Sequence, residues 1–462
     1  MTSHPAHHLL GLLTLPALFF TASLTANGQD LPDSAIRTIL QERVTSKRAV
    51  GLVVGVLDHG QRKIFTAGTA DAPGVALDGN TVFEIGSITK VFTASLLADM
   101  VARGEVRLED PVAKYLPPSV HVPSRNGKQI TLLDLATQSS GLPRMPNNFT
   151  PKDQNNPYAD YTVDQMYAFL SGYELSRDIG AQYEYSNLGV GLLGHALSRR
   201  AGKSYEALVT ERILKPLGMS DTKITLDAAA KSHLAAGHST NGAAAANWDL
   251  PTLAGAGAIR STANDMLKFI AANLDSTSKP LGPVLATTHY ARRDVDAVQM
   301  KIGLNWHILN AFGRPLVWHN GGTGGYRSFI GMDAAAQRGV VVLSNQSIGA
   351  DDIGFHLLDA RAPLAPAPKV RKEIAVDPAL LETYVGVYQL SPTFSLTITR
   401  EGASLFGQGT GQPKIEMFAE SPTEFFLKDV DAQITFEKDP AGKVTRLILH
   451  QGGMNVPGVK AK

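Results

Sequence analysis

Strand-like segments stand near both ends of the larger part of this chain, and they constrain its fold more than any other feature. Near the start, Val50–Leu57 and Lys63–Ala67 predict a hairpin around the turn Asp58–Gln61. Strand-like runs return much later, at Phe329–Met332 and Gly339–Ser344, whereas helical and loop patterns dominate between them. The sequence therefore predicts an α/β fold in which the returning chain completes one sheet.

A serine and a lysine three residues apart stand where a glycine-containing turn runs into an apolar helix. The stretch is Phe83-Glu-Ile-Gly-Ser-Ile-Thr-Lys90, and apolar residues recur at helical spacing after it. Because residues i and i+3 share a helix face, the Lys90 amine can reach the Ser87 oxygen. A serine hydroxyl needs a neighbouring base to become a nucleophile, and the helix N-terminus favours an oxyanion beside it. The pair therefore indicates acyl transfer through a serine ester.

The spacing alone does not decide the function. It also occurs at Ser220–Lys223 and Ser276–Lys279, in stretches that look like surface loops. Taken alone, Ser87 also fits an N-cap serine that a solvated lysine follows one turn later. The catalytic interpretation depends on two further motifs.

These motifs bring polar groups that complement the Ser-Lys pair. Tyr183-Glu-Tyr-Ser-Asn187 precedes an apolar helix, so Tyr185 and Asn187 are expected to point from one loop into a site. Trp318-His-Asn-Gly-Gly-Thr-Gly-Gly-Tyr326 leads into the late strands, and its glycines let a substrate approach the backbone closely. Each residue also has a purely structural interpretation: a packing tyrosine, a helix N-cap and, for His319, a core histidine.

In their order and spacing, the three motifs resemble those of the serine β-lactamase and penicillin-binding-protein superfamily. The closest resemblance is to its class C-like branch, which also holds D-amino-acid peptidases and certain carboxylesterases. The flanks Ile130–Pro143 and Gly257–Met266 look like that branch too, so the resemblance covers residues 31–360. It implies a β-lactamase-like antiparallel sheet with a helical subdomain. It also implies a serine hydrolase without a cofactor, acting on a β-lactam, a D-amino-acid peptide or an ester.

The resemblance implies a role for each matching residue. Ser87 would be the acylated nucleophile, and Lys90 would accept its proton or hold it poised. Tyr185 would relay protons, and its ordinary pKa of about 10 has to fall if it is to act as a base. Asn187 would hydrogen-bond a substrate carbonyl. The backbone N–H groups of Ser87 and Gly322 would form an oxyanion hole, worth about 3–4 kcal/mol per donor.

The third motif departs from the family pattern. Most β-lactamases of this branch have Lys-Thr-Gly, whereas this chain has His319-Asn-Gly321, which with Gly322 would line the substrate site. An imidazole, whose ordinary pKa is about 6.5, is mostly neutral near pH 7, so a permanent anchor for the substrate carboxylate is lost. Arg327 is a candidate replacement, and otherwise a surface arginine on a strand. The histidine variant is common among esterase and peptidase members of the branch.

Competing activities stay open at this point. Penicillin-recognising folds also serve as receptors that become acylated without efficient turnover, and short-chain carboxylesterases share the branch. Tyr185, as a deacylating group, favours turnover over the receptor alternative. The signature Gly-x-Ser-x-Gly is absent, which disfavours an α/β-hydrolase fold.

The first 28 residues predict a signal peptide. Leu9–Leu24 is an apolar run, and the small residues Ala26 and Gly28 suit cleavage before Gln29. Pro16 and the short run disfavour a membrane anchor, so no stable membrane span is expected in the mature form. The sequence therefore predicts a secreted or periplasmic protein.

Composition excludes some partners and chemistries. The chain has 43 basic and 42 acidic residues, with a formal charge of +1 and no basic patch, so nucleic acid is not an expected partner. It has no cysteine, which excludes disulfides and thiolate metal sites, and it lacks His-Glu-x-x-His. The expected partner is a small-molecule or peptide substrate, with no metal. The sequence does not report the oligomeric state.

A second, smaller domain is predicted at the C-terminus. A Pro/Ala-rich linker spans 361–375, and residues 376–462 read as short strands of a small antiparallel β-barrel. This part resembles the lipocalin-like domain that is often appended to such hydrolases. The expected strands are Tyr384–Tyr388, Ser395–Thr399, Glu424–Leu427, Ala432–Phe436 and Val444–Leu449.

Overall fold

The computed structural model describes residues 31–295, 300–366, 371–391, 394–410, 414–428, 432–451 and 454–461. The predicted signal peptide at 1–28, its cleavage site before Gln29 and residues 367–370 of the predicted linker lie outside these residues. None of the helices in the described ranges has the length and apolarity that a membrane span requires.

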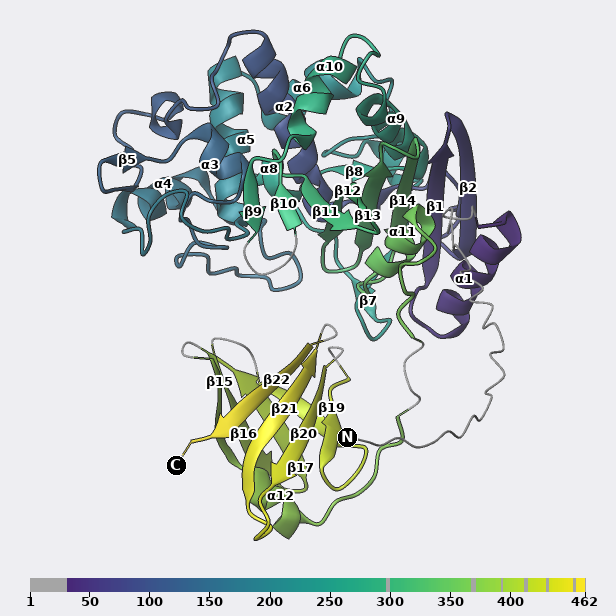
Figure 1. Cartoon of the computed structure of the whole chain (residues 1–462), viewed down its shortest axis with the longest axis vertical. Coiled ribbons are helices and arrows are strands. Elements are labelled where there is room, and N and C mark those ends of the chain that lie inside the picture. The colour runs from purple at the N-terminus through teal and green to yellow at the C-terminus, as the bar shows by residue number, and fades with distance from the viewer. Residues whose placement is uncertain are drawn as a thin grey trace, which may run out of the picture.

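One eight-stranded sheet organises the larger part of the chain (Figure 1). All its pairings are antiparallel, in the order β2-β1-β14-β13-β12-β11-β10-β9. Val54 on β1 lies opposite Val342 on β14, which confirms that the returning chain completes the sheet. The strands are β1 Gly51–Asp58, β2 Gln61–Gly68, β9 Arg293–Val295, β10 Met300–Ile302, β11 His307–Ala311, β12 Arg314–Gly322, β13 Arg327–Asp333 and β14 Arg338–Ser344.

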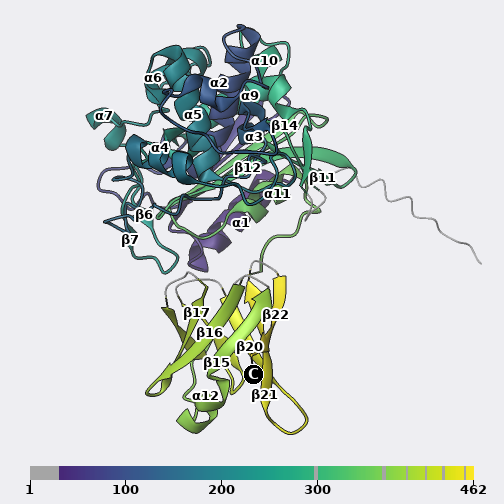
Figure 2. The ribbon, with the colours of Figure 1, turned by 90° about the vertical axis from the view of Figure 1, so that its left-hand side faces the viewer.

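Helices cover both faces of this sheet, because successive side chains of a strand point to opposite sides. Val53 packs into the core that includes α2 and α9, whereas Val54 packs into the core that includes α1 and α11. Figure 2 shows α2 and α9 on one side of β12 and β14, and α1 and α11 on the other. These helices are α1 Asp33–Thr45, α2 Thr89–Ala102, α9 Ala263–Leu274 and α11 Asp351–Leu358.

Helix α2 forms the centre of the helical layer. Every residue from Thr89 to Met100 is buried, as expected for a helix that is largely apolar on all sides. It packs against α5 Asn187–Ala201 and the short α8 Ala254–Gly257. The lysine at the start of α2 is therefore enclosed by neighbouring helices and shielded from water.

Shorter elements complete this part of the chain. The remaining helices are α3 Leu132–Ala136, α4 Val163–Gly172, α6 Tyr205–Val209, α7 Ala228–Lys231, α10 Gly282–Ala286, η1 Gly86–Ile88, η2 Val112–Tyr115, η3 Thr210–Leu214 and η4 Thr287–His289. Three two-stranded ribbons pair β3 Phe83–Glu84 with β8 Arg260–Ser261, β4 Ser124–Arg125 with β5 Lys128–Gln129, and β6 Gly237–His238 with β7 Ala244–Ala245.

The C-terminal strands close into an eight-stranded antiparallel barrel, as predicted (Figure 1). Aromatic side chains fill its interior, where the Tyr384 and Phe436 rings stack 4.2 Å apart. One predicted strand was wrong at its start, because Tyr384 ends helix α12 and the strand begins at Gly386. The elements are α12 Pro378–Tyr384, β15 Gly386–Ser391, β16 Phe394–Glu401, β17 Ser404–Gly409, β18 Lys414–Ala419, β19 Glu424–Phe426, β20 Ala432–Lys438, β21 Val444–Gln451 and β22 Met454–Lys460.

Candidate active site

Ser87 lies on the 3₁₀ turn η1, between strand β3 and helix α2, and its side chain is partly exposed. The preceding Gly86 has φ +49°, a conformation that favours glycine. A Cβ at Gly86 would lie 2.7 Å from the backbone nitrogen of Gly322. The serine turn is therefore pressed against the glycine-rich end of β12, and Gly86 is needed for this approach.

Lys90 stands one helical turn after Ser87 and is fully buried, at 0% exposure. Its Nζ lies 2.9 Å from Ser87 Oγ, 2.9 Å from Asn187 Oδ1 and 2.7 Å from the Ala256 carbonyl oxygen. Burial, with a smaller contribution from the charge of Arg144, holds the pKa of Lys90 well below its ordinary value. In the part of the chain that the structure describes, no carboxylate pairs with this amine.

The second motif is held rigidly at the start of α5. Ser186, not Asn187, is the N-cap: its Oγ accepts a hydrogen bond from the Gly189 N–H at 2.8 Å. Asn187 is thus free to face the site, where its Oδ1 accepts from Lys90 and its Nδ2 donates to the Tyr158 hydroxyl at 3.2 Å. The Asn187 amide thus connects the Lys90 amine to the Tyr158 hydroxyl.

Tyr185 lies between two basic side chains. Lys90 Nζ is 4.8 Å and Arg144 Cζ is 5.1 Å from the centre of its ring, and the His319 ring lies 6.3 Å away. A role of Tyr185 as a base would require its pKa to fall. Burial raises the pKa above 10, and this effect outweighs the opposing interactions with the Ser87 side chain and with Arg144. Tyr185 is a protonated phenol at neutral pH.

His319 of the third motif is buried in β12, at 1% exposure. Its Nδ1 donates to the Asn320 carbonyl oxygen at 2.6 Å, and its ring stacks on that of His307 at 4.9 Å. Burial, together with the nearby His307 and Lys90, holds the pKa of His319 well below its ordinary value. This position therefore supplies no positive charge at neutral pH.

The glycines after His319 bring the strand against the serine turn. A Cβ on Gly321 would overlap the Ile85 carbonyl oxygen, and one on Gly322 would lie 2.6 Å from Arg327 Nη1. Arg327 begins β13, and its Nη1 donates to the carbonyl oxygens of Thr323 and Tyr326, both at 3.0 Å. Its guanidinium is thus engaged with backbone rather than held free for a substrate.

All seven predicted site residues meet at this place, through the contacts given above for Ser87, Lys90, Tyr185, Asn187, His319, Gly321 and Gly322. Sequence reasoning missed two neighbours, Arg144 and Tyr158. Arg144 directly follows the flank Ile130–Pro143, and this position is the one feature of the sequence that could have pointed to it as a site residue. Tyr158 sits in a loop without a motif.

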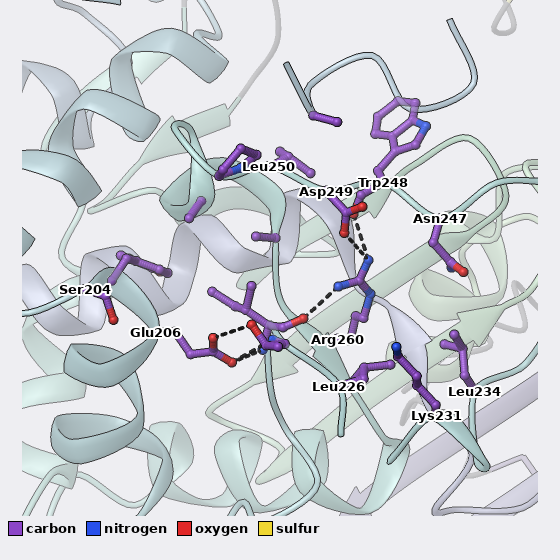
Figure 3. Close-up of a pocket in the computed structure, with 17 residues that line it drawn as sticks. Ser204, Glu206, Leu226, Lys231, Leu234, Asn247, Trp248, Asp249, Leu250 and Arg260 are labelled. Atoms are coloured by element: carbon purple, nitrogen blue, oxygen red, sulfur yellow. Dashed lines mark hydrogen bonds and ion pairs between the residues drawn. The ribbon is translucent and has the colours of Figure 1, made fainter. Parts of the chain in front are cut away.

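A separate cavity of about 880 Å³ opens beside this site (Figure 3). Ser87, Lys90 and Tyr185 do not line it. Arg260 reaches across it to the Trp248 carbonyl oxygen, 2.8 Å away, and to Asp249. Trp248 links the two regions, since its ring lies 5.4 Å from that of Tyr158. Within the described ranges, no group of three or more His, Cys, Asp and Glu side chains is placed to hold a metal ion.

The Ser-Lys pair, with a buried lysine and with a tyrosine and an asparagine around it on this fold, is the arrangement of a serine hydrolase of the β-lactamase type. The chain belongs to the Beta-lactamase family, whose model matches residues 36–361. A second family model, described as a domain of unknown function (DUF3471), matches residues 370–457.

Individual relatives agree with this family. The chain is 31% identical over 344 residues to the D-alanyl-D-alanine-carboxypeptidase/endopeptidase AmpH of Escherichia coli (strain K12), which covers 69% of this chain and 88% of the relative. It is 27% identical over 351 residues to a Beta-lactamase of Pseudomonas fluorescens, covering 68% and 92%. A solved structure of a Beta-lactamase/D-alanine carboxypeptidase from Yersinia pestis complexed with citrate matches with a TM-score of 0.60 and 29% identity, over 68% of this chain and 92% of that one.

Proposed function

We propose that the protein is an exported serine hydrolase that opens an amide or ester bond through an acyl-Ser87 intermediate. One observation carries this proposal: the fully buried Lys90 amine lies 2.9 Å from the Ser87 hydroxyl. A low lysine pKa makes the amine a base near neutral pH, which is what an otherwise unreactive serine hydroxyl needs.

The three partners of Lys90 set the direction of proton transfer. Asn187 Oδ1 and the Ala256 carbonyl oxygen are acceptors only, whereas the Ser87 hydroxyl can also donate. A neutral amine has two N–H groups and one lone pair. Its N–H groups go to the two carbonyl oxygens, and the lone pair then faces Ser87. Lys90 is therefore ready to take the serine proton.

The proposed reaction has two steps. In the first, Ser87 Oγ attacks the carbonyl carbon, its proton passes to Lys90 and then to the leaving nitrogen or oxygen, and the bond to the leaving group breaks. In the second, water attacks the acyl ester, its proton passes through Lys90 to Ser87 Oγ, the bond between the acyl carbon and Oγ breaks, and the carboxylic acid leaves. The backbone N–H groups of Ser87 and Gly322 would stabilise the oxyanion in both steps, since their turns lie in contact.

Tyr185 and Asn187 support these steps in different ways. Tyr185, as a protonated phenol beside Lys90, would donate its proton to the leaving group and recover one from the lysine. Asn187 would hold the substrate carbonyl while its Oδ1 fixes the lysine. His319, Gly321 and Gly322 would form the opposite wall, against which an extended substrate lies.

The relatives favour a D-amino-acid peptide or a β-lactam as substrate, because the two described above, which match over two thirds of the chain, are named as a carboxypeptidase/endopeptidase and a β-lactamase. A short-chain ester stays an alternative because of His319-Asn-Gly. A receptor that becomes acylated without efficient turnover is the second candidate. The raised pKa of Tyr185 favours it, since a phenol that holds its proton is a weak base for deacylation.

Mass spectrometry of the protein mixed with a chromogenic cephalosporin, a D-alanyl-D-alanine peptide or a p-nitrophenyl ester tests these alternatives. Turnover with a fleeting adduct on Ser87 supports a hydrolase, and a long-lived adduct supports the receptor. Ser87→Ala removes the nucleophile while leaving the packing of η1 intact, so the adduct is expected to disappear. Appreciable turnover by this variant would contradict the acyl-serine mechanism.

The proposed export and domain organisation rest on the sequence. Residues 1–28 would be removed before Gln29, leaving a hydrolase domain at 31–360, a linker at 361–375 and a lipocalin-like domain at 376–462. Expression of the full chain in a bacterium, followed by the intact mass of the protein in the periplasm and medium, tests the cleavage. A mass that still includes residues 1–28 would contradict it.

A further inference from the structure

Arg144 carries an exposed positive charge at the mouth of the site. Its guanidinium carbon lies 5.1 Å from the centre of the Tyr185 ring, on the same ring that Lys90 approaches at 4.8 Å. Within the described part of the chain, Arg144 has no carboxylate partner within the 4.0 Å of an ion pair. An uncompensated guanidinium beside the catalytic groups makes the site attractive to an anion.

The backbone of Arg144 is fixed, although its side chain is exposed. Its carbonyl oxygen accepts the N–H groups of Asn187 at 3.0 Å and Leu188 at 3.3 Å, the first two residues of α5. The guanidinium rests over the Tyr185 ring, as a cation–π pair does. The side chain is therefore positioned next to the catalytic groups before any substrate arrives.

Other basic groups near the third motif are not free to bind an anionic group of a substrate. His319 is buried and neutral, and Lys90 is enclosed by its three partners. Arg327 is occupied by the carbonyl oxygens of Thr323 and Tyr326. In the described structure, Arg144 is the basic side chain near Ser87 that is exposed and whose guanidinium edge has no hydrogen-bond partner.

We propose that Arg144 binds a carboxylate of the substrate and so selects acyl donors that carry a negative charge near the scissile bond. This inference rests on the proposed function, because it assigns the substrate class of the same site. A guanidinium presents a planar fork that matches a carboxylate with two parallel hydrogen bonds. Among the candidate substrates, a D-amino-acid peptide and a β-lactam carry such a carboxylate, whereas a simple short-chain ester does not.

The test compares two substrates that differ only in charge: a peptide ending in D-alanyl-D-alanine, and the same peptide with a C-terminal amide. We expect the full-length protein to prefer the free acid. Arg144→Gln should lower kcat/KM for the acid by about 10- to 100-fold, mainly through KM, because a charge-assisted hydrogen-bond pair is lost. The amide should change less than about threefold. Arg144→Lys should restore part of the preference, since it keeps the charge without the fork.

A matched control is Arg62→Gln, which removes the same charge from an exposed position on β2. It should leave both substrates unchanged. An equal loss on acid and amide in Arg144→Gln would overturn the proposal, as would a wild-type protein without preference for the acid. Either result points to a structural role or to another anchor.

A binding measurement separates this proposal from the acyl-serine mechanism. In the Ser87→Ala background, calorimetry with the acid and the amide reports recognition without turnover. We expect tighter binding of the acid, and loss of that difference in Ser87→Ala/Arg144→Gln. Turnover retained by Ser87→Ala would contradict the acyl-serine mechanism, but it would not affect the measured preference for the acid. Equal binding of acid and amide to Ser87→Ala would sink the Arg144 proposal alone.

Discussion

Lys90 Nζ and Asn187 Oδ1 lie 2.9 Å apart, although the two residues are 97 positions apart in the sequence. This contact joins helix α2 to helix α5 and couples the nucleophile motif to the second motif. It also allows the lysine to stay a neutral amine, because the amide oxygen accepts an N–H but brings no negative charge that would stabilise an ammonium. A negative charge at the same position would change that balance.

Asn187→Asp is therefore expected to raise the pKa of Lys90 and to keep it protonated near neutral pH. A protonated lysine cannot accept the Ser87 proton, so the acid limb of kcat/KM should move to higher pH by at least about one unit. The pH dependence of acylation, followed by stopped-flow with a chromogenic substrate, checks this. Asn241→Asp makes the same change in an exposed turn and should keep the wild-type profile. An acid limb that stays in place would show that Lys90 is not the base.

Tyr185→Phe should slow acylation. The protonated phenol is replaced by a ring of the same shape, so the packing against Lys90 and Arg144 is kept. Loss of the proton that the phenol gives to the leaving group is expected to lower the acylation rate by about 100-fold or more. The acyl-protein should then form more slowly than in the wild type, which intact-mass spectrometry at short times after mixing detects. A variant that turns over at the wild-type rate would remove Tyr185 from the mechanism.

Gly86→Ala tests the close approach of the serine turn to β12. A Cβ there would lie 2.7 Å from Gly322 N, on a backbone with φ +49°. Either β12 or the turn has to move, and Ser87 moves with it, so acylation should fall by about 100-fold or more. Gly104→Ala is the matched control: its φ is +71°, but a Cβ there meets nothing within 4 Å. Backbone strain alone would affect both variants equally, whereas a displaced serine affects only the first.

The sequence predicted the elements whose pattern is local. The hairpin around Asp58–Gln61 and helix α2 were confirmed, because alternating and helical periods mark them clearly. Strands β9 Arg293–Val295 and β10 Met300–Ile302 were missed, since three residues are too few to show alternation. In the barrel, β17 and β18 were missed, since glycines and charged residues interrupt their apolar pattern.

Site residues were predicted from motif order, but their environment was not. The pKa of Tyr185 is raised because burial by segments distant in the sequence outweighs a neighbouring positive charge, and burial cannot be read from spacing. Arg144 was missed because its role depends on a loop that folds over Tyr185. Residue type and order thus reveal the chemistry of the site, whereas the packing around them sets the protonation states.

His319→Lys should not create a working lysine motif. The side chain is buried at 1% exposure, stacks on His307, and lies close enough to Lys90 to feel its charge. An ammonium at this position would have no carboxylate partner among the described residues, so we expect the variant to lose about 3–5 kcal/mol of unfolding free energy near neutral pH. The loss should shrink as pH rises and the lysine becomes neutral. His319→Gln, which is neutral, should lose clearly less. A stable Lys variant with faster cephalosporin turnover would contradict this account.

Acid should destabilise the hydrolase part of the chain through its buried histidines. Burial lowers the pKa of His289 and of His307 to about 4, and that of His319 also falls. In the unfolded chain these side chains take up protons below about pH 6.5, whereas the folded protein keeps them neutral. The unfolded state thus binds more protons as pH falls, so the unfolding free energy decreases from about pH 7 down to about pH 4.

A fall from the ordinary pKa to about 4 corresponds to about 3 kcal/mol for the buried His307 at the acid end, and to less for the partly exposed His289. Urea unfolding at several pH values, followed by tryptophan fluorescence, measures this. All three tryptophans, Trp248, Trp306 and Trp318, lie outside the barrel, so the signal reports the hydrolase part. His289→Gln keeps a side-chain N–H for Asn273, which His289 contacts at 2.8 Å, but cannot titrate. Its unfolding free energy should fall less steeply with acid, and curves parallel to the wild type would contradict a neutral His289 in the folded protein.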